Sequence, residues 1–214
     1  MMKKCVLFCM ALLMSISLTA CEGLFDFMPG DTCDPQAAMI TIQSSELGAF
    51  KIDAYEVSRS TATALTQGTG TSLACVYERT IPWSGITFAD AKAACEDAGK
   101  RLCTLEEWQT ACQTDDKMTY PYGNEYNAET CNGDATIGSV SPTGLLAECK
   151  TSNGIFDMSG NLREWVAEGI LAGGSYNANS DELKCTATLD PTDPLTYQPT
   201  SSDGFRCCDD ASIN

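Results

Sequence analysis

The chain has 214 residues, with 13 Lys and Arg against 29 Asp and Glu, which gives a formal net charge of −16 at pH 7. A surface this acidic repels nucleic acid and anionic membrane, so we expect no nucleic-acid partner. The sequence contains no histidine and no C-x-x-C motif. These absences exclude the usual zinc and dithiol redox sites, catalysis of the Ser-His-Asp or Cys-His kind, and iron held by histidine.

Residues 1–20 are predicted to be an export signal. They begin with Lys3 and Lys4, continue with an apolar run too short to span a membrane, and end in small residues before Cys21. The segment Leu18-Thr19-Ala20-Cys21 resembles a bacterial lipobox, which implies cleavage before Cys21 and lipid attachment to that residue. Ordinary signal cleavage, with Cys21 left as a plain thiol, is the alternative.

Lipid on Cys21 would hold the protein on the bacterial cell envelope, at the outer membrane or the cell surface. Loss of Lys3 and Lys4 leaves 11 basic against 29 acidic residues, a formal charge of −18, so the attachment would come from the lipid and not from charge. Residues 21–38, rich in Gly, Pro and acids, are predicted to form a lipidated tether. Residues 39–214 have the length of one domain with its own core.

Two strands are expected at the start of this domain, at Met39–Ile42 and Phe50–Val57. The second alternates apolar and polar residues with a period of two, which is typical of a half-buried strand. Residues 58–74 are rich in Thr, Ser and Gly and are predicted to be loop.

Two helices are predicted next. The first covers Ile86–Gly99 and begins with Thr87 as its cap, and the second follows a capping box that Thr104 opens. Their apolar residues recur at helical spacing, so one face of each helix is expected to be buried. These faces contain Ala91, Ala94, Cys95 and Ala98 in the first helix, and Leu105, Trp108, Ala111 and Cys112 in the second.

The rest of the chain shows little periodicity. Residues 113–153 are predicted to form a series of turns without a long periodic segment. Short strands are predicted at Ile170–Tyr176 and Gly204–Cys208. The tract between these strands contains three prolines and is predicted to be a surface loop.

Ten cysteines remain after the signal and Cys21 are set aside. An even number of cysteines in an exported protein predicts up to five disulfides, whose pairing the sequence does not settle. They are Cys33, Cys75, Cys95, Cys103, Cys112, Cys131, Cys149, Cys185, Cys207 and Cys208.

The string Gly154–Trp165 (GIFDMSGNLREW) combines two acids with turn-forming glycines. A turn that carries Asp157 and Glu164, with Gly160 free to take a positive φ, can aim several oxygens at one point, as calcium requires. The same string resembles the signature of the formylglycine-generating-enzyme family, the sulfatase-modifying-factor domain. Five further blocks resemble the family in the same order: Phe50–Val57, Thr87–Cys112, Tyr120–Asn124, Gly173–Tyr176 and Gly204–Cys207.

This resemblance implies an α+β fold, irregular and loop-rich, of the C-type-lectin-like kind and stapled by disulfides. By analogy with family members it implies the pairs Cys95–Cys207 and Cys112–Cys185, each worth roughly 4 kcal/mol on the loop-closure model. For the other cysteines we suggest only Cys103 with Cys131. We also expect Arg101 and Arg206 to pair with Glu107 or Glu164, because a buried arginine usually has a carboxylate partner.

Catalysis in the family oxidises a substrate cysteine to formylglycine, and it uses two thiols after the Gly-Gly-Ser loop to hold Cu(I). Thiolates select Cu(I), and a lone thiol does not build a two-thiolate site. In this chain Ala178 stands where the first thiol is expected. Cys185 matches the structural partner of Cys112 better, so we expect no copper and no catalytic residues.

The family's calcium loop maps onto Asp157, the carbonyls of Gly160 and Leu162, and Glu164, which are all oxygen donors. A structural calcium ion is therefore predicted. The alternative is that Asp157 and Glu164 cap turns and bond Arg206 or Arg163.

We compare three candidate functions for the protein. We favour a non-catalytic, surface-anchored module that binds an unknown protein or glycan partner in the envelope, or takes part in assembly there. The second is an oxygen-dependent formylglycine-generating oxidoreductase that acts on cysteine of exported sulfatase-like proteins. The third, carbohydrate binding, rests on fold kinship alone, since the chain has no Glu-Pro-Asn or Gln-Pro-Asp triplet.

Overall fold

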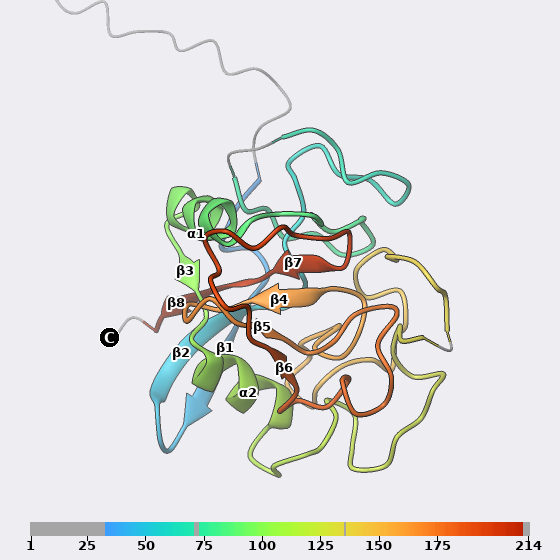
Figure 1. Cartoon of the computed structure of the whole chain (residues 1–214). Coiled ribbons are helices and arrows are strands. Elements are labelled where there is room, and N and C mark those ends of the chain that lie inside the picture. The colour runs from blue at the N-terminus through green and yellow to red at the C-terminus, as the bar shows by residue number, and fades with distance from the viewer. Residues whose placement is uncertain (1–32, 71–72, 135, 212–214) are drawn as a thin grey trace, which may run out of the picture.

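The computed structural model describes residues 33–70, 73–134 and 136–211 (Figure 1). The predicted signal, Cys21 and residues 22–32 of the expected tether lie outside the described residues. Within the described part of the chain, no helix is both long enough and apolar enough to cross a membrane.

The fold is α+β, with two four-stranded sheets, two helices and long loops (Figure 1). The first sheet is antiparallel, and its strands in spatial order are β1 (Met39–Ser44), β2 (Gly48–Asp53), β8 (Cys207–Asp210) and β3 (Arg101–Leu102). The second sheet has the order β6 (Thr188–Leu189), β5 (Leu171–Ala172), β4 (Arg163–Trp165) and β7 (Asp203–Phe205), and β4 and β7 run parallel. The irregular C-type-lectin-like architecture predicted from the family resemblance is confirmed.

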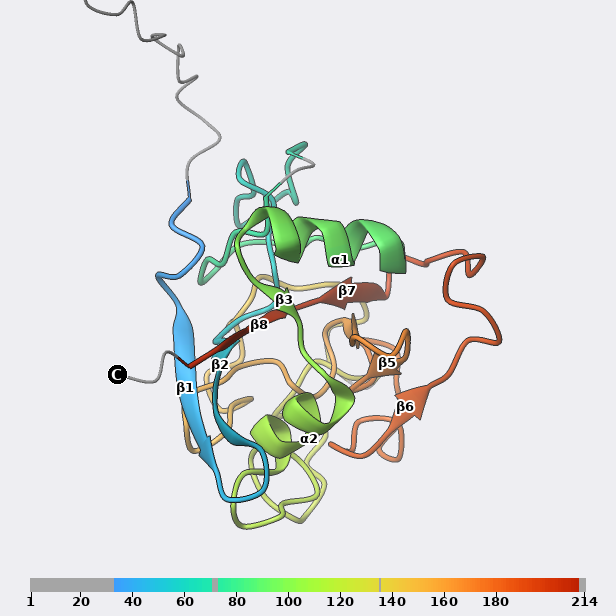
Figure 2. The ribbon, with the colours of Figure 1, turned by 90° about the vertical axis from the view of Figure 1, so that its left-hand side faces the viewer.

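Both predicted helices are present. Helix α1 spans Phe88–Asp97, and its cap Thr87 accepts a hydrogen bond from the backbone N–H of Asp90. Helix α2 spans Leu105–Gln113, and Thr104 and Glu107 form the predicted capping box. Figure 2 shows the two helices on one side of the molecule, with β3 running between them.

The two helices pack into two separate clusters of the core. Ala91, Ala94 and Cys95 of α1 pack with Trp165 and Phe205 of the second sheet. The buried face of α2 packs with the first sheet and with the Gly154–Trp165 turn, and this cluster contains Trp108, Ala111, Cys112, Ile52, Ile155 and Met158.

Strand β1 extends two residues beyond the predicted Met39–Ile42, whereas the other three predicted strands are shorter than expected. Strand β2 ends at Asp53, since the next residues leave the sheet and place Glu56 against residues 161–162. The strand expected at Ile170–Tyr176 is reduced to β5, because Gly173 and Gly174 take positive φ angles of 88° and 68°. The one expected at Gly204–Cys208 is split into β7 and β8 by Arg206, whose side chain turns into the core.

Five disulfides join all ten cysteines of the described residues. The pairs implied by the family resemblance, Cys95–Cys207 and Cys112–Cys185, are both formed. The suggested pair of Cys103 with Cys131 is wrong. Successive residues of β8 point to opposite faces, so Cys207 reaches α1 while Cys208 reaches Cys103. The two remaining pairs are Cys131–Cys149 and Cys33–Cys75.

Asp53 and Lys100 form an ion pair that is closed off from solvent. The Lys100 ammonium lies 2.9 and 3.0 Å from the two carboxylate oxygens, and neither side chain is exposed. The backbone N–H of Cys207 donates a further hydrogen bond to Asp53. The pair therefore joins the end of β2, the start of β3 and the start of β8.

Replacement of Lys100 tests how much the fold depends on this pair. Lys100→Met leaves the buried Asp53 carboxylate without a cation, so we expect a loss of about 3–5 kcal/mol in the free energy of unfolding at pH 7. The control is Lys92→Met, which removes the cation of a solvent-exposed pair with Glu96 on α1 and should cost less than about 1 kcal/mol. Equal losses in urea unfolding of the two variants would contradict the structural role of the Asp53–Lys100 pair.

Candidate functional site

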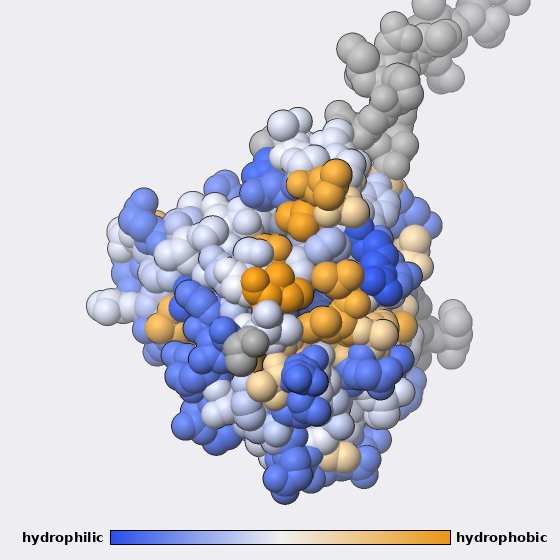
Figure 3. Space-filling model, turned by 90° about the vertical axis from the view of Figure 1, so that its right-hand side faces the viewer, coloured by the Kyte–Doolittle hydropathy of each residue, from blue (hydrophilic) through white to orange (hydrophobic). Residues whose placement is uncertain are grey.

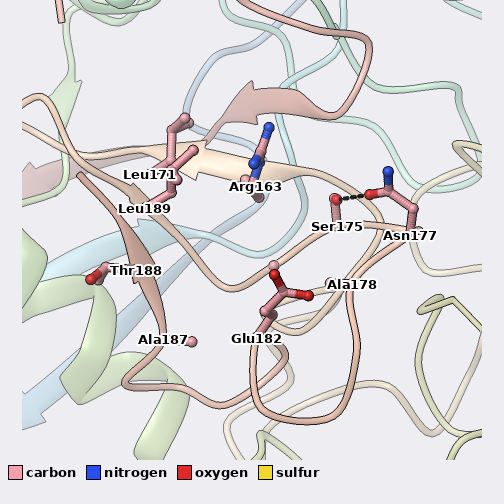
Figure 4. A pocket seen from close by; sticks show the side chains of 10 residues that line it. Arg163, Leu171, Ser175, Asn177, Ala178, Glu182, Ala187, Thr188 and Leu189 are labelled. Carbon is pink, nitrogen blue, oxygen red and sulfur yellow. Dashed lines mark hydrogen bonds between the residues drawn. The ribbon is translucent and has the colours of Figure 1, made fainter. Parts of the chain in front are cut away.

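A cavity of about 250 Å³ lies beside the Gly173–Tyr176 loop, where the family resemblance places the copper-binding thiols. Strands β4, β5 and β6 and the loop after β5 form its walls. Figure 4 shows Arg163 and Glu182 on opposite sides of the cavity, with Leu171 and Leu189 along one wall and Ser175 and Asn177 along another. The remaining lining residues are Gly174, Ala178, Ala187 and Thr188.

Two glycines give the loop its shape. At Gly173 a Cβ atom would lie 2.8 Å from the Trp108 ring, and at Gly174 it would lie 2.5 Å from the carbonyl oxygen of Glu182. Both residues also have a positive φ, which other residue types rarely adopt. The close approach of the loop to Trp108 and to residue 182 therefore depends on glycine at both positions.

Most polar groups of the cavity already have hydrogen-bond partners within the protein. The Ser175 hydroxyl donates to Asn177 Oδ1 at 2.6 Å (Figure 4). The Arg163 Nε donates to the buried Asp203 carboxylate at 2.8 Å, and Glu182 accepts two hydrogen bonds from Asn179. The cavity thus presents a neutralised arginine, an acid and small hydroxyl and amide groups.

No thiol faces the cavity among the described residues. Ala178 lies in its wall, and Cys185 is bonded to Cys112. Cu(I) in a two-thiolate site needs two free sulfur ligands, so the residues present do not fit the copper ion that the family implies.

The acids of the Gly154–Trp165 turn lie elsewhere, in the core below the cavity. Both oxygens of the buried Glu164 carboxylate accept hydrogen bonds from Arg206, from Nε at 2.6 Å and Nη2 at 2.7 Å. Oε2 also accepts a hydrogen bond from Trp108 Nε1. The expected pairing of Arg206 with Glu164 is confirmed, as is that of Arg101 with Glu107.

Asp157 is held separately from Glu164. Its Oδ2 accepts a hydrogen bond from the backbone N–H of Gly144 at 2.7 Å, and its own φ is positive, at 56°. Burial raises the pKa of Asp157 to about 6, while the Gly144 N–H acts in the opposite direction. Gly160 and Leu162 lie between these acids, and the Leu162 N–H is bonded to Glu56.

Glu56 is the member of this cluster that the sequence did not reveal. Its side chain is fully buried and accepts hydrogen bonds from the Leu162 N–H at 2.8 Å and from Asn161 Nδ2. Burial first, and then the charges of Asp157 and Glu164, raise the pKa of Glu56 well above its ordinary value. The charge of Arg206 acts on all three acids, although its guanidinium is hydrogen-bonded only to Glu164 among them. The glutamate of the Phe50–Val57 block was visible in the sequence, but nothing there indicated that it would reach residues 161 and 162.

The predicted calcium ligands are Asp157, Gly160, Leu162 and Glu164, and the contacts described above limit which of them can bind a cation. Glu164 does not fit as a calcium ligand in this arrangement, because both of its oxygens are bonded to Arg206. Within the described residues there is also no group of three or more Cys, Asp or Glu side chains placed to hold a metal ion. Calcium binding by this turn stays a prediction.

The family description "Sulfatase-modifying factor enzyme 1-like domain" matches residues 23–211. The chain belongs to this family. The match takes in the cavity, the Gly154–Trp165 turn and all five disulfides.

Relatives of the chain have different names. The inactive C-alpha-formylglycine-generating enzyme 2 of Bos taurus is 29% identical over 149 residues, which cover 59% of this chain and 49% of that protein. The serine/threonine-protein kinase pkn1 of Chlamydia caviae is 28% identical over 152 residues, 59% of this chain and 24% of that protein. The chain thus spans from a quarter to a half of the length of these relatives.

Among solved structures, Treponema denticola variable protein 1 superposes with a TM-score of 0.61 at 14% identity, over 81% of this chain and 95% of that one. This likeness supports the fold, and at such low identity it carries no information on activity.

The raised pKa of Asp157 predicts a pH dependence of stability. Because the folded-state pKa of about 6 exceeds the ordinary 3.8, the contribution of this group is full below about pH 4 and is lost as the pH rises through 6. Asp157→Asn has no charge to bury, keeps an oxygen for the Gly144 N–H and tolerates a positive φ. We expect the variant to match the wild type near pH 4 and to exceed its unfolding free energy by on the order of 1–3 kcal/mol at pH 7.5. Urea unfolding in the presence of a chelator measures this difference, and a difference that does not change with pH would contradict it.

The calcium prediction has its own test in the melting temperature. A calcium ion bound to the folded state alone raises the melting temperature above its value in chelator, and Asp157→Asn should abolish that rise. A melting temperature that is the same in calcium and in chelator would remove the assignment. Because both Glu164 oxygens are bonded to Arg206, we expect the melting temperature to be the same in calcium and in chelator.

Proposed function

We propose that this protein is an exported, lipid-anchored member of the family that does not oxidise cysteine and serves as a binding or assembly module in the bacterial cell envelope. The observation that carries the proposal is the content of the cavity, where Ala178 occupies a wall and the nearest candidate thiol, Cys185, is in a disulfide. The name of the bovine relative, which calls that protein inactive, supports a non-catalytic role.

The disulfides support export. Five disulfides, in which every cysteine except Cys33 is buried, fit a protein that matures in an oxidising compartment. Attachment through lipid on Cys21, at the outer membrane or the cell surface, is part of the proposal.

The cavity supports a binding role better than a catalytic one. Its polar groups are already satisfied within the protein, and the Arg163 charge is balanced by Asp203. Such a surface can accept hydrogen bonds and apolar contacts from a protein or glycan partner, but it offers no activated nucleophile and no poised acid–base pair.

Counting free thiols separates this module from a formylglycine-generating oxidoreductase. We expect a denatured, unreduced sample to take up no maleimide at the ten paired cysteines, and a reduced sample to take up ten labels there. We also expect no tight Cu(I) binding and no conversion of a cysteine-containing peptide under oxygen, with an active formylglycine-generating enzyme as the positive control. Labels on Cys112 and Cys185 together with Cu(I) binding would overturn the non-catalytic proposal.

A further inference from the structure

The point where the N-terminal segment meets the domain is fixed by a covalent bond. Cys33, the first described residue, is joined to Cys75 with a Cα–Cα distance of 5.7 Å. Cys75 in turn pairs with Ser58 through two backbone hydrogen bonds, of 2.7 and 3.1 Å, which close the loop between them at its base. A chain that arrives from Cys21 therefore enters the domain at the base of this loop.

The distance from Cys21 to this point is limited by chain length. Cys33 lies twelve positions after Cys21, and a fully extended chain covers at most about 3.3–3.6 Å per residue, or roughly 40 Å in all. A lipid on Cys21 would thus keep the loop end of the domain near the membrane. Figures 1 and 2 both show the start of the described chain beside this loop, drawn in teal, at one end of the molecule.

The loop differs from the rest of the chain in charge. Eighteen consecutive residues, 60–77, contain no Asp, Glu, Lys or Arg, whereas 20% of the whole chain is charged. Figure 3 shows this end of the molecule, next to the grey N-terminal chain, largely in pale and orange shades. An acidic protein held close to a lipid surface can approach it most easily with its uncharged part.

An ordered turn presents a leucine at the tip of this loop. Leu65 is 94% exposed, and Thr63 holds the turn on both sides of it. The Thr63 N–H donates to the Thr66 carbonyl at 2.8 Å, and its hydroxyl accepts from the N–H groups of Leu65 and Thr66. The Ile81 N–H bonds the Thr63 carbonyl, and this bond ties the turn to the body of the domain.

We propose that residues 60–70 form a lipid-facing surface, in which Leu65 inserts between the headgroups of the membrane that holds the lipid on Cys21. This inference rests on the proposed lipid anchor. Residues 60–70 carry no charge that would have to be desolvated, and a leucine side chain favours the apolar side of the interface. The contact would place β6, which forms part of the cavity wall, on the side of the domain away from the membrane, because β6 lies far from this loop (Figures 1 and 2).

Tryptophan fluorescence can test the contact, because all three native tryptophans are at most 5% exposed. The variant Leu65→Trp is prepared as the full, lipidated protein in phosphatidylcholine vesicles with and without brominated acyl chains. We expect its added emission to shift to shorter wavelength on vesicles and to be lost with brominated lipid. The control is Tyr126→Trp, 38% exposed in the 113–130 segment at the other end of the molecule, whose emission should change in neither condition.

Vesicle flotation separates failure of the anchor from failure of the contact. Lipidated wild type should float with vesicles, and Cys21→Ser should not. If the wild type does not float, the anchor is wrong, and this inference is overturned with it. If the wild type floats but residues 65 and 126 are quenched alike, or neither is quenched, the anchor holds and the lipid-facing loop is wrong.

Discussion

The fold depends on one buried guanidinium. Arg206 follows β7, is fully buried, and bonds the Glu164 carboxylate of β4 together with the carbonyl oxygens of Asp53 and Phe156. A guanidinium has five N–H donors in a rigid plane, and four of them are used here. Because these partners belong to different sheets and to the turn between them, Arg206 sets the position of β4. Arg163, which precedes Glu164 on β4, then projects into the cavity.

Local chemistry explains which parts of this arrangement the sequence could predict. The two helices followed from Thr87 and from the capping box at Thr104, since both signals act within one helical turn. The Arg206–Glu164 pair followed from the cost of burying an unpaired arginine. The contacts of Glu56 could not be predicted, since its partners lie more than a hundred residues away and only the tertiary fold brings them together. The partner of Cys103 was missed for a similar reason: Cys207 and Cys208 are equivalent in sequence, and only the face of β8 distinguishes them.

The acidic turn and the cavity are separate parts of the structure, although the residues 154–165 and 173–178 that contribute to them are close in the sequence. The Gly154–Trp165 string identifies the family, yet its acids are used inside the core, where Glu164 binds Arg206 and Asp157 binds the Gly144 backbone. The cavity is built from the opposite side of β4 and from a glycine loop against Trp108. The strongest family signal therefore reports how the scaffold is held, while the residues that would decide an activity lie around Ala178, in the wall of the cavity.

The adjacent cysteines of β8 impose an order on maturation. Cys207 closes a loop back to residue 95 and Cys208 closes one back to residue 103, on opposite faces of the same strand. The first bond needs residue 207 and the second needs residue 208, whereas the other three disulfides need no residue beyond 185. A chain that ends before residue 207 therefore leaves α1 and the segment between β3 and α2 without their covalent links to β8.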